Sequence, residues 1–179
     1  FMPTAAVTNG GFNDEQKAEN DLKRALVEQA MYEISTYSFY SEKDLDLLKI
    51  PADAPERRFI KIKNPIGEDL SVMRTTLAPS MLHTIVRNLR RGNMEGRLFE
   101  IAKVYLPRQL PLADFPDEKK RLCIGLFGTC DFFDLKGVTE AIADSLRTTF
   151  EYVPSSRSFL HPGVCADIVC GGKVIGYAG

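Results

Sequence analysis

Three charged residues near the middle of the chain are of the types that hold nucleotides and other anions. Arg74 follows a short apolar run, and Arg97 and Glu100 fall in a predicted strand, Arg97–Leu106. Because successive strand residues point to opposite faces of a sheet, two residues three apart address different ligands. Arg97 and Glu100 can hold one nucleotide together only if a β-bulge intervenes. For Arg74, a structural ion pair or a capping contact competes with anion binding.

Two aspartates and a histidine are weaker candidates for chemistry. Asp131 and Asp134 could act as paired carboxylates, but aspartate is also a preferred residue at a helix N-cap, and a predicted helix follows at once. We favour a capping role for one of the two. His161 lies beside proline and glycine where a strand begins, so we favour a structural role over a ligand contact.

The spacing of the cysteines gives little support for a metal site or for secretion. The thiol and imidazole groups belong to six residues: Cys123, Cys130, Cys165, Cys170, His83 and His161. No two cysteines have the C-x-x-C spacing of common zinc sites. Free thiols in a reducing cytosol explain this pattern better, so we expect a cytoplasmic chain without a bound metal. No apolar run approaches the roughly 20 residues of a membrane span, so no membrane partner is expected.

The length of the chain favours a single domain. Its charge balance gives no sign of a nucleic-acid-binding surface. The chain has 179 residues, 44% of them hydrophobic, and 23 basic residues face 24 acidic ones. That length suffices for one buried core, and the near balance gives no general attraction for RNA or anionic membranes. We expect a lead-in over residues 1–12 and one domain over residues 13–179, truncated at both ends.

An amphipathic helix is predicted to open the domain. Asn13 and Gln16 have the spacing of a capping box, and the helix is expected to reach about Tyr32. Its apolar stripe comprises Ala18, Leu22, Ala25, Leu26 and Ala30. Such a stripe packs on the chain's own sheet or on another subunit. The candidates for subunit contact on this helix are Leu22, Ala25 and Leu26.

A second amphipathic helix is predicted in the middle of the chain. Its apolar residues are Leu77, Met81, Leu82, Ile85, Val86 and Leu89. Leu82 and Ile85 are the interface candidates here. The arginines at its end are Arg87, Arg90 and Arg91. Cations near a helix C-terminus interact favourably with the helix dipole; contact with RNA is the alternative, which no interleaved aromatic residues support.

The remaining pattern predicts an α+β fold, an antiparallel β-sheet flanked by helices. Before the second amphipathic helix we expect strands at Glu33–Tyr40 and Phe59–Lys63, with a short helix, Glu42–Leu48, between them. After it we expect a large hairpin of Arg97–Leu106 and Arg121–Gly128. A helix to about Phe150, a strand at Glu151–Val153 and a hairpin of Val164–Cys170 and Lys173–Ala178 complete the chain. Gly-rich phosphate-binding motifs are absent.

Five ordered blocks together resemble the beta subunit of bacterial phenylalanyl-tRNA synthetase. They are Tyr37-Ser38-Phe39 with its preceding helix, N-P-I-G-E-D-L-S-V-M-R-T-T-L from Asn64, N-L-R-R-G-N followed by R-L-F-E-I-A-K-V-Y, D-F-F-D-L-K-G from Asp131, and L-H-P-G with G-G-K-V-I-G-Y in Leu160–Tyr177. Each block alone is a weak signal. In this order they cover nearly the whole chain and are specific.

The resemblance implies a class II aminoacyl-tRNA synthetase-like fold that is catalytically inert. Asn13–Tyr40 is similar to the motif-1 helix and strand, which form subunit interfaces, and Arg97–Leu126 is similar to the motif-2 strand–loop–strand. The Gly-rich motif 3 with its arginine is not found. The implied partner is the alpha subunit, with two alpha and two beta chains assembled around tRNA. ATP and magnesium are implied for the assembled enzyme, at the alpha site, and not for this segment.

Two hypotheses of function follow. In the first, the chain is an assembly module of a phenylalanine–tRNA ligase, which joins phenylalanine to its tRNA using ATP. In the alternative, it is an active adenylating domain that binds ATP and an amino acid, with Arg74, Arg97 and Glu100 lining the nucleotide pocket.

Overall fold

The computed structural model of the chain describes residues 10–179, so most of the predicted lead-in lies outside the described residues. The helices are α1 (Asp14–Glu28), α2 (Glu42–Leu47), α3 (Ala78–Arg90) and α4 (Phe132–Ser145), with short 3-10 turns at Pro55–Arg57 and Glu68–Leu70. The strands are β1 (Tyr32–Glu33), β2 (Phe39–Tyr40), β3 (Val72–Met73), β4 (Gly96–Leu106), β5 (Asp117–Phe127), β6 (Glu151–Pro154), β7 (Ala166–Cys170) and β8 (Lys173–Ala178). Within these residues, no helix has the length and apolarity to cross a membrane.

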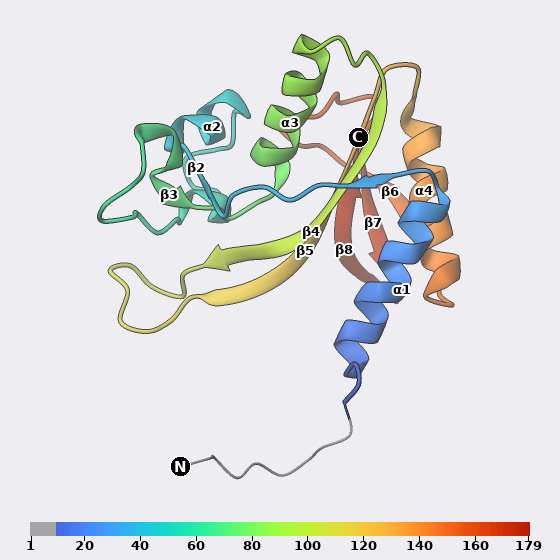
Figure 1. Ribbon diagram of the computed structural model, residues 1–179, viewed down its shortest axis with the longest axis horizontal. Coiled ribbons are helices and arrows are strands. Elements are labelled where there is room, and N and C mark those ends of the chain that lie inside the picture. Colours follow the sequence, from blue (N-terminus) through green and yellow to red (C-terminus); the bar gives the residue numbers. More distant parts are fainter. Residues whose placement is uncertain (1–9) are drawn as a thin grey trace, which may run out of the picture.

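The β4–β5 hairpin is the centre of the structure (Figure 1). Its strands pair antiparallel from Gly96 opposite Phe127 to Leu106 opposite Asp117, and β1 pairs parallel with β4 on the other edge. The predicted hairpin is therefore confirmed, and β5 begins earlier than the expected Arg121. The first residues of β5, Asp117–Arg121, are charged and mostly exposed, so alternation of apolar residues gives no signal there.

The two faces of this hairpin are covered by different helices. Phe99 and Ile124, directly opposite one another, point to the face that α1 and α4 cover. Gly125 points to the other face, where an added Cβ would lie within 3 Å of Met81 and Ile85 of α3. A glycine is thus required for α3 to approach the sheet this closely. Figure 1 shows α3 on one side of the hairpin and α1 and α4 on the other.

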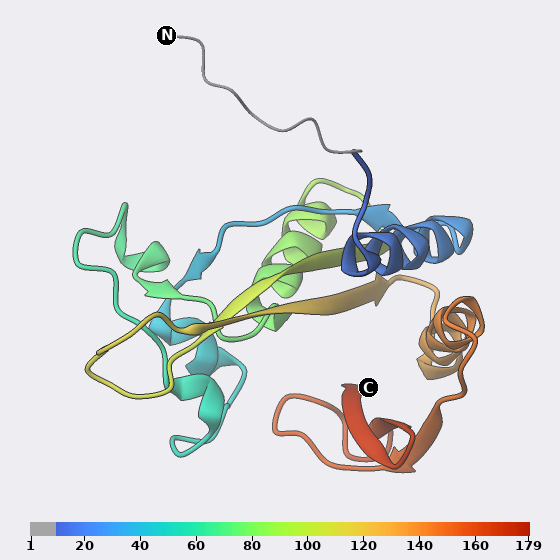
Figure 2. The ribbon, with the colours of Figure 1, turned by 90° about the horizontal axis from the view of Figure 1, so that it is seen from below.

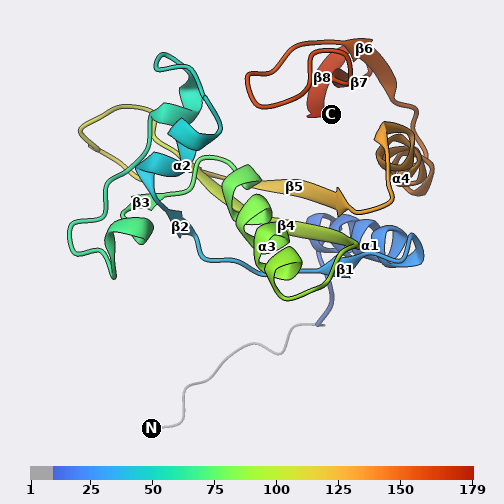
Figure 3. The ribbon, with the colours of Figure 1, turned by 90° about the horizontal axis from the view of Figure 1, so that it is seen from above.

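The principal core lies between the hairpin, α1 and α4. Its fully or nearly fully buried residues are Leu26, Met31, Phe99, Val138 and Ile142. A second core joins α2 to the β2–β3 pair, with Tyr40, Leu45, Leu48, Ile50, Phe59 and Val72. Figure 3 shows this second group at the loop end of the β4–β5 hairpin, away from α1 and α4.

Two predicted strands are wrong in extent. Glu33–Tyr40 divides into β1 and β2, which belong to different sheets. The division follows from the backbone of Thr36, whose N–H donates to the Glu100 carboxylate and not to a neighbouring strand. In Phe59–Lys63, the structure has an isolated bridge between Lys61 and Val72 in place of a strand.

The third sheet, in the order β6-β7-β8, lies beside α4 (Figure 2). A hydrogen bond of 2.7 Å between the hydroxyls of Thr139 and Tyr152 joins α4 to β6. The turn between β7 and β8 places Gly171 and Gly172 at φ of 56° and 74°. Two residues with positive φ form the tight hairpin turn that matches strand twist, so the predicted final hairpin is confirmed.

Each capping prediction is confirmed in detail. The Asn13 side chain accepts from the Gln16 N–H at 2.8 Å, and the Gln16 side chain accepts from the Asn13 N–H at 2.9 Å. Asp131 and Asp134 form the same reciprocal box at the start of α4. Ser41 caps α2. These side chains satisfy backbone N–H groups that have no partner within the helix.

Two of the predicted helices end early. We expected α1 to reach Tyr32 and α4 to reach Phe150, but the chain turns at Ala30 and Arg147, whose φ angles are 57° and 53°. A left-handed residue ends a helix by allowing the following N–H groups to bond back to the last turn. Glycine usually occupies this position. Because Ala30 and Arg147 stand there instead, the sequence did not indicate where the helices end.

Candidate functional site

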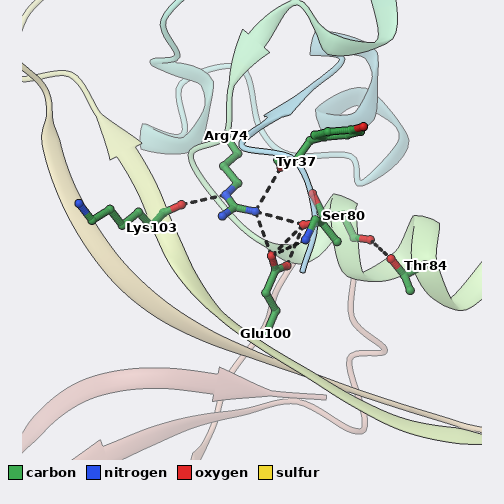
Figure 4. Close-up of polar contacts among 7 residues, drawn as sticks. Tyr37, Arg74, Ser80, Thr84, Glu100 and Lys103 are labelled. Carbon is green, nitrogen blue, oxygen red and sulfur yellow. Dashed lines mark hydrogen bonds and ion pairs between the residues drawn. The ribbon is translucent and has the colours of Figure 1, made fainter. Parts of the chain in front are cut away.

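Arg74, a candidate for nucleotide binding, is enclosed by protein groups (Figure 4). Its Nε donates to the Lys103 carbonyl at 2.8 Å. Its Nη1 lies 3.1 Å from the Thr36 hydroxyl, 3.2 Å from the Tyr37 carbonyl and 3.2 Å from Glu100 Oε1. The guanidinium therefore joins β4 to the segment between β1 and β2. This confirms the interpretation of Arg74 as a partner in a structural ion pair.

The Glu100 carboxylate is also occupied by hydrogen bonds from protein groups. It accepts from the Thr36 N–H at 2.9 Å, from the Thr36 hydroxyl and from Arg74. Only 4% of the Arg74 side chain and 3% of the Glu100 side chain are exposed. Additional hydrogen bonds offset the cost of burying an ion pair, and here Thr36, Tyr37 and Lys103 supply them. The Glu100 carboxylate and the Nε and Nη1 groups of Arg74 are thus occupied by groups of the protein itself.

A second buried chain of hydrogen bonds adjoins this ion pair. The Thr75 hydroxyl donates to the Glu56 carbonyl at 2.6 Å, so the Tyr40 hydroxyl, 2.7 Å away, donates to Thr75. The Thr75 N–H in turn donates to the Tyr40 hydroxyl at 3.0 Å. Burial raises the pKa of Tyr40. These contacts hold the chain just before α3 in place.

Arg97 lies on the opposite face of β4 from Glu100, as the residue spacing predicted. Its guanidinium is 3.6 Å from the Asp134 carboxylate, and both side chains are 40% exposed. They border a shallow, open hollow of about 510 Å³ lined by Gln29, Arg97, Asp131, Phe133, Asp134, Gly137 and Val138. The structure does not bring Arg74, Arg97 and Glu100 together, so the pocket of the adenylation hypothesis is not formed.

The other candidate residues are occupied locally. The Asp131 carboxylate accepts from the N–H groups of Phe133 and Asp134, and the Asp134 carboxylate accepts from the N–H of Asp131. His161 is exposed, and its Nδ1 accepts from the Gly163 N–H at 3.1 Å. All four cysteines are free thiols. Among residues 10–179, no three His, Cys, Asp or Glu side chains are placed to hold a metal ion.

The interface candidates divide between core and surface. Leu26 is fully buried and Ala25 nearly so, which places both inside the chain and corrects their assignment as contact residues. Leu22 packs on the same core and is partly buried. Leu82 of α3 is 44% exposed, while Ile85 is half-buried against Gly125. Among these candidates, only Leu82 presents a largely free apolar side chain.

The residues that hold the ion pair could not have been found from sequence. Thr36 supplies an N–H and a hydroxyl to Glu100, and Lys103 supplies only its carbonyl. Threonine is common in strand segments, so its presence does not indicate a buried contact. A backbone carbonyl is present in every residue, so it cannot be recognised from residue type. The contacts follow from the crossing of distant segments.

The arrangement of helices and sheets is that of a class II aminoacyl-tRNA synthetase domain. Two solved structures of pyrrolysyl-tRNA synthetase from Desulfitobacterium hafniense superpose with a TM-score of 0.66 each. They are 21% and 22% identical to this chain; the matches cover 90% and 88% of it, and 54% and 56% of those chains. At this identity the likeness establishes the fold alone.

The chain belongs to the family described as the phenylalanyl tRNA synthetase beta chain CLM domain, whose family model matches residues 1–179. It is 37% identical to the phenylalanine–tRNA ligase beta subunit of Clostridium acetobutylicum, covering 92% of this chain and 21% of that protein. The corresponding subunit of Geobacter metallireducens is 33% identical over 99% of this chain and 24% of its own length. The chain thus spans about a fifth to a quarter of these relatives.

Proposed function

We propose that this chain is an assembly module of a phenylalanine–tRNA ligase beta subunit that packs on the alpha subunit and performs no chemistry itself. One observation carries the proposal: the charged residues needed for a nucleotide site neutralise one another or lie on opposite faces of β4. Arg74 and Glu100 form a buried ion pair, and Arg97 is paired with Asp134 on the other face.

In this proposal the assembled enzyme attaches phenylalanine to its tRNA in the cytoplasm. ATP and magnesium act at the site of the alpha subunit, and two alpha and two beta chains form the enzyme. This chain contributes a rigid domain whose exposed helix and hairpin surfaces are available to other subunits. Family membership supports this role, because the matching relatives are beta subunits.

The experiment that tests the assembly role is sedimentation velocity of the chain, alone and mixed with the alpha subunit of the same synthetase. We expect a faster-sedimenting species in the mixture that contains both proteins. Separate sedimentation of the two at micromolar concentration would contradict the proposal.

Isothermal titration with ATP and Mg²⁺ distinguishes the adenylation alternative, which the structure does not favour. We expect no measurable heat from the wild-type chain. Binding at sub-millimolar concentration that is lost in Arg97→Ala would instead support a nucleotide site. Val27→Ala is a suitable control, because Val27 is exposed on α1 and outside the hollow beside Arg97.

A further inference from the structure

Helix α3 carries an apolar stripe that faces away from its own sheet. Leu82, Val86 and Leu89 are 44%, 41% and 37% exposed. Successive helical residues advance by roughly 100°, so these three fall within about 60° of one another around the helix. Spacing of this kind is the pattern by which a helix presents anchors to a partner helix.

The contacts of α3 with the sheet do not use this stripe. Met81 is buried, and it packs with Ile85 against Gly125 of β5. The stripe lies to one side of that contact and stays in water. In Figure 3, α3 lies in front of the hairpin, with no other element covering it in that view. The helix therefore has a packed side and an unpartnered apolar side.

Three arginines lie in and just after the last turn of α3, and all three carry the same sign of charge. Arg87, Arg90 and Arg91 are exposed, and none of them forms an ion pair with any residue from 10 to 179. Helix α3 contains no aspartate or glutamate. Arg90, the last residue of α3, lies four residues after Val86, so it adjoins the stripe on the helix surface. We name Leu82, Val86, Leu89 and these three arginines the α3 outer face.

The charge of the α3 outer face limits what can cover it. A two-fold dimer through this face would bring the arginines of one copy against those of the other, since an isologous interface uses the same surface twice. RNA would engage the arginines through phosphates but would leave the apolar stripe without a partner. An acidic amphipathic helix satisfies both halves of the face.

We propose that the α3 outer face binds an acidic amphipathic helix of the alpha subunit. The inference rests on the proposed assembly function and specifies its surface. Apolar residues of the incoming helix cover Leu82, Val86 and Leu89, and its carboxylates meet Arg87 and Arg90. Because the charges remain at the rim of the contact, they contribute mainly to the association rate and to selection of the partner.

The test measures the dissociation constant for the alpha subunit with wild-type chain and with two variants. The double variant Leu82→Asp/Val86→Asp is expected to weaken binding at least about tenfold, because it places carboxylates in the apolar contact. Val174→Asp is the matched control, since Val174 is likewise exposed but lies on β8. Circular dichroism and thermal unfolding verify that the variants remain folded, as expected for surface positions.

The charge-reversal variant Arg87→Glu/Arg90→Glu/Arg91→Glu tests the sign of the partner. We expect weaker binding and a smaller salt dependence than in wild type, because fewer opposite charges are left to screen. A matched control reverses three exposed lysines elsewhere: Lys63→Glu/Lys119→Glu/Lys173→Glu. It is expected to retain the wild-type affinity.

The outcomes separate this inference from the proposed function. If the wild-type chain does not bind the alpha subunit, both fail. If it binds and the two α3 variants bind equally well, the assembly role stands and the α3 outer face is not the contact. If the charge reversal abolishes binding of tRNA and leaves binding of the alpha subunit unchanged, the face is an RNA surface and the inference is overturned.

Discussion

Nη1 of Arg74 lies 3.2 Å from Oε1 of Glu100, and less than a twentieth of either side chain is exposed. Helix α3 separates them along the chain, and the pair fixes how β4 crosses the segment between β1 and β2. Burial makes each charge dependent on the other, because an isolated charge in the protein interior is costly. Because the two residues are paired with each other, they do not bind a ligand, and they are important for the stability of the chain.

Replacing Arg74 with alanine is expected to lower the free energy of unfolding by about 3–5 kcal/mol, since Glu100 would remain buried without its partner. Urea denaturation measures the change. Arg97→Ala is the control: its pair with Asp134 is half-exposed, so its loss should cost less than about 1 kcal/mol. Equal effects of the two substitutions would show that the Arg74 pair is not buried as described.

Leu26→Ala tests the placement of α1 in the core. Leu26 has no exposed surface, so the substitution should destabilise the chain by about 2–5 kcal/mol through lost burial and a cavity. The neighbouring Val27 is 59% exposed, and Val27→Ala should change the free energy by about 0.5 kcal/mol or less. Thermal and urea unfolding provide the comparison. A stable Leu26→Ala variant that fails to bind the alpha subunit would restore Leu26 as a contact residue.

Ala30→Gly is expected to stabilise the chain by up to about 1 kcal/mol. Ala30 ends α1 at φ 57°, a conformation that glycine adopts without the clash of a Cβ. Ala18→Gly, at an exposed position within the same helix, should instead destabilise by about 1 kcal/mol. Opposite shifts in the melting temperature would confirm the left-handed helix end, and a loss of stability in both variants would exclude it.

Cys123 should react slowly with alkylating reagents at pH 8. Burial of the thiol, with a further contribution from Glu100, raises its pKa from 9.0 to about 12, and the thiolate is the reactive form. A variant that retains Cys123 alone should therefore gain reactivity only as the pH rises well above 9. A variant that retains only Cys130, in the loop before α4, serves as the comparison.

The same shift predicts an alkaline loss of stability. Below pH 9 the thiol of Cys123 is protonated in both the folded and the unfolded chain. Above pH 9 the unfolded thiol ionises while the folded one keeps its proton up to about pH 12, so the free energy of unfolding falls across this window. Cys123→Ser should reduce that fall. An unchanged pH profile would mean that the Cys123 thiol is not held in a buried environment.

Much of the local structure could be predicted because its causes are local. Asn13 with Gln16, and Asp131 with Asp134, are capping partners three residues apart. Gly171 and Gly172 specify the last hairpin turn. The split of Glu33–Tyr40 could not be predicted, because its cause is the carboxylate of Glu100, far along the chain. Nor could the early end of α1, because Ala30 lacks the usual preference for a left-handed conformation.

By itself the sequence determined the α+β class, the helix caps, the central hairpin and the opposite orientation of Arg97 and Glu100, since alternation along a strand depends only on the backbone. The tertiary structure alone decided which side of an amphipathic helix is buried. Leu26 and Leu82 both belong to apolar stripes, yet one is enclosed between α4 and the hairpin and the other remains exposed on α3. The reason is that burial depends on how elements distant in sequence pack together, which periodicity within one helix cannot report.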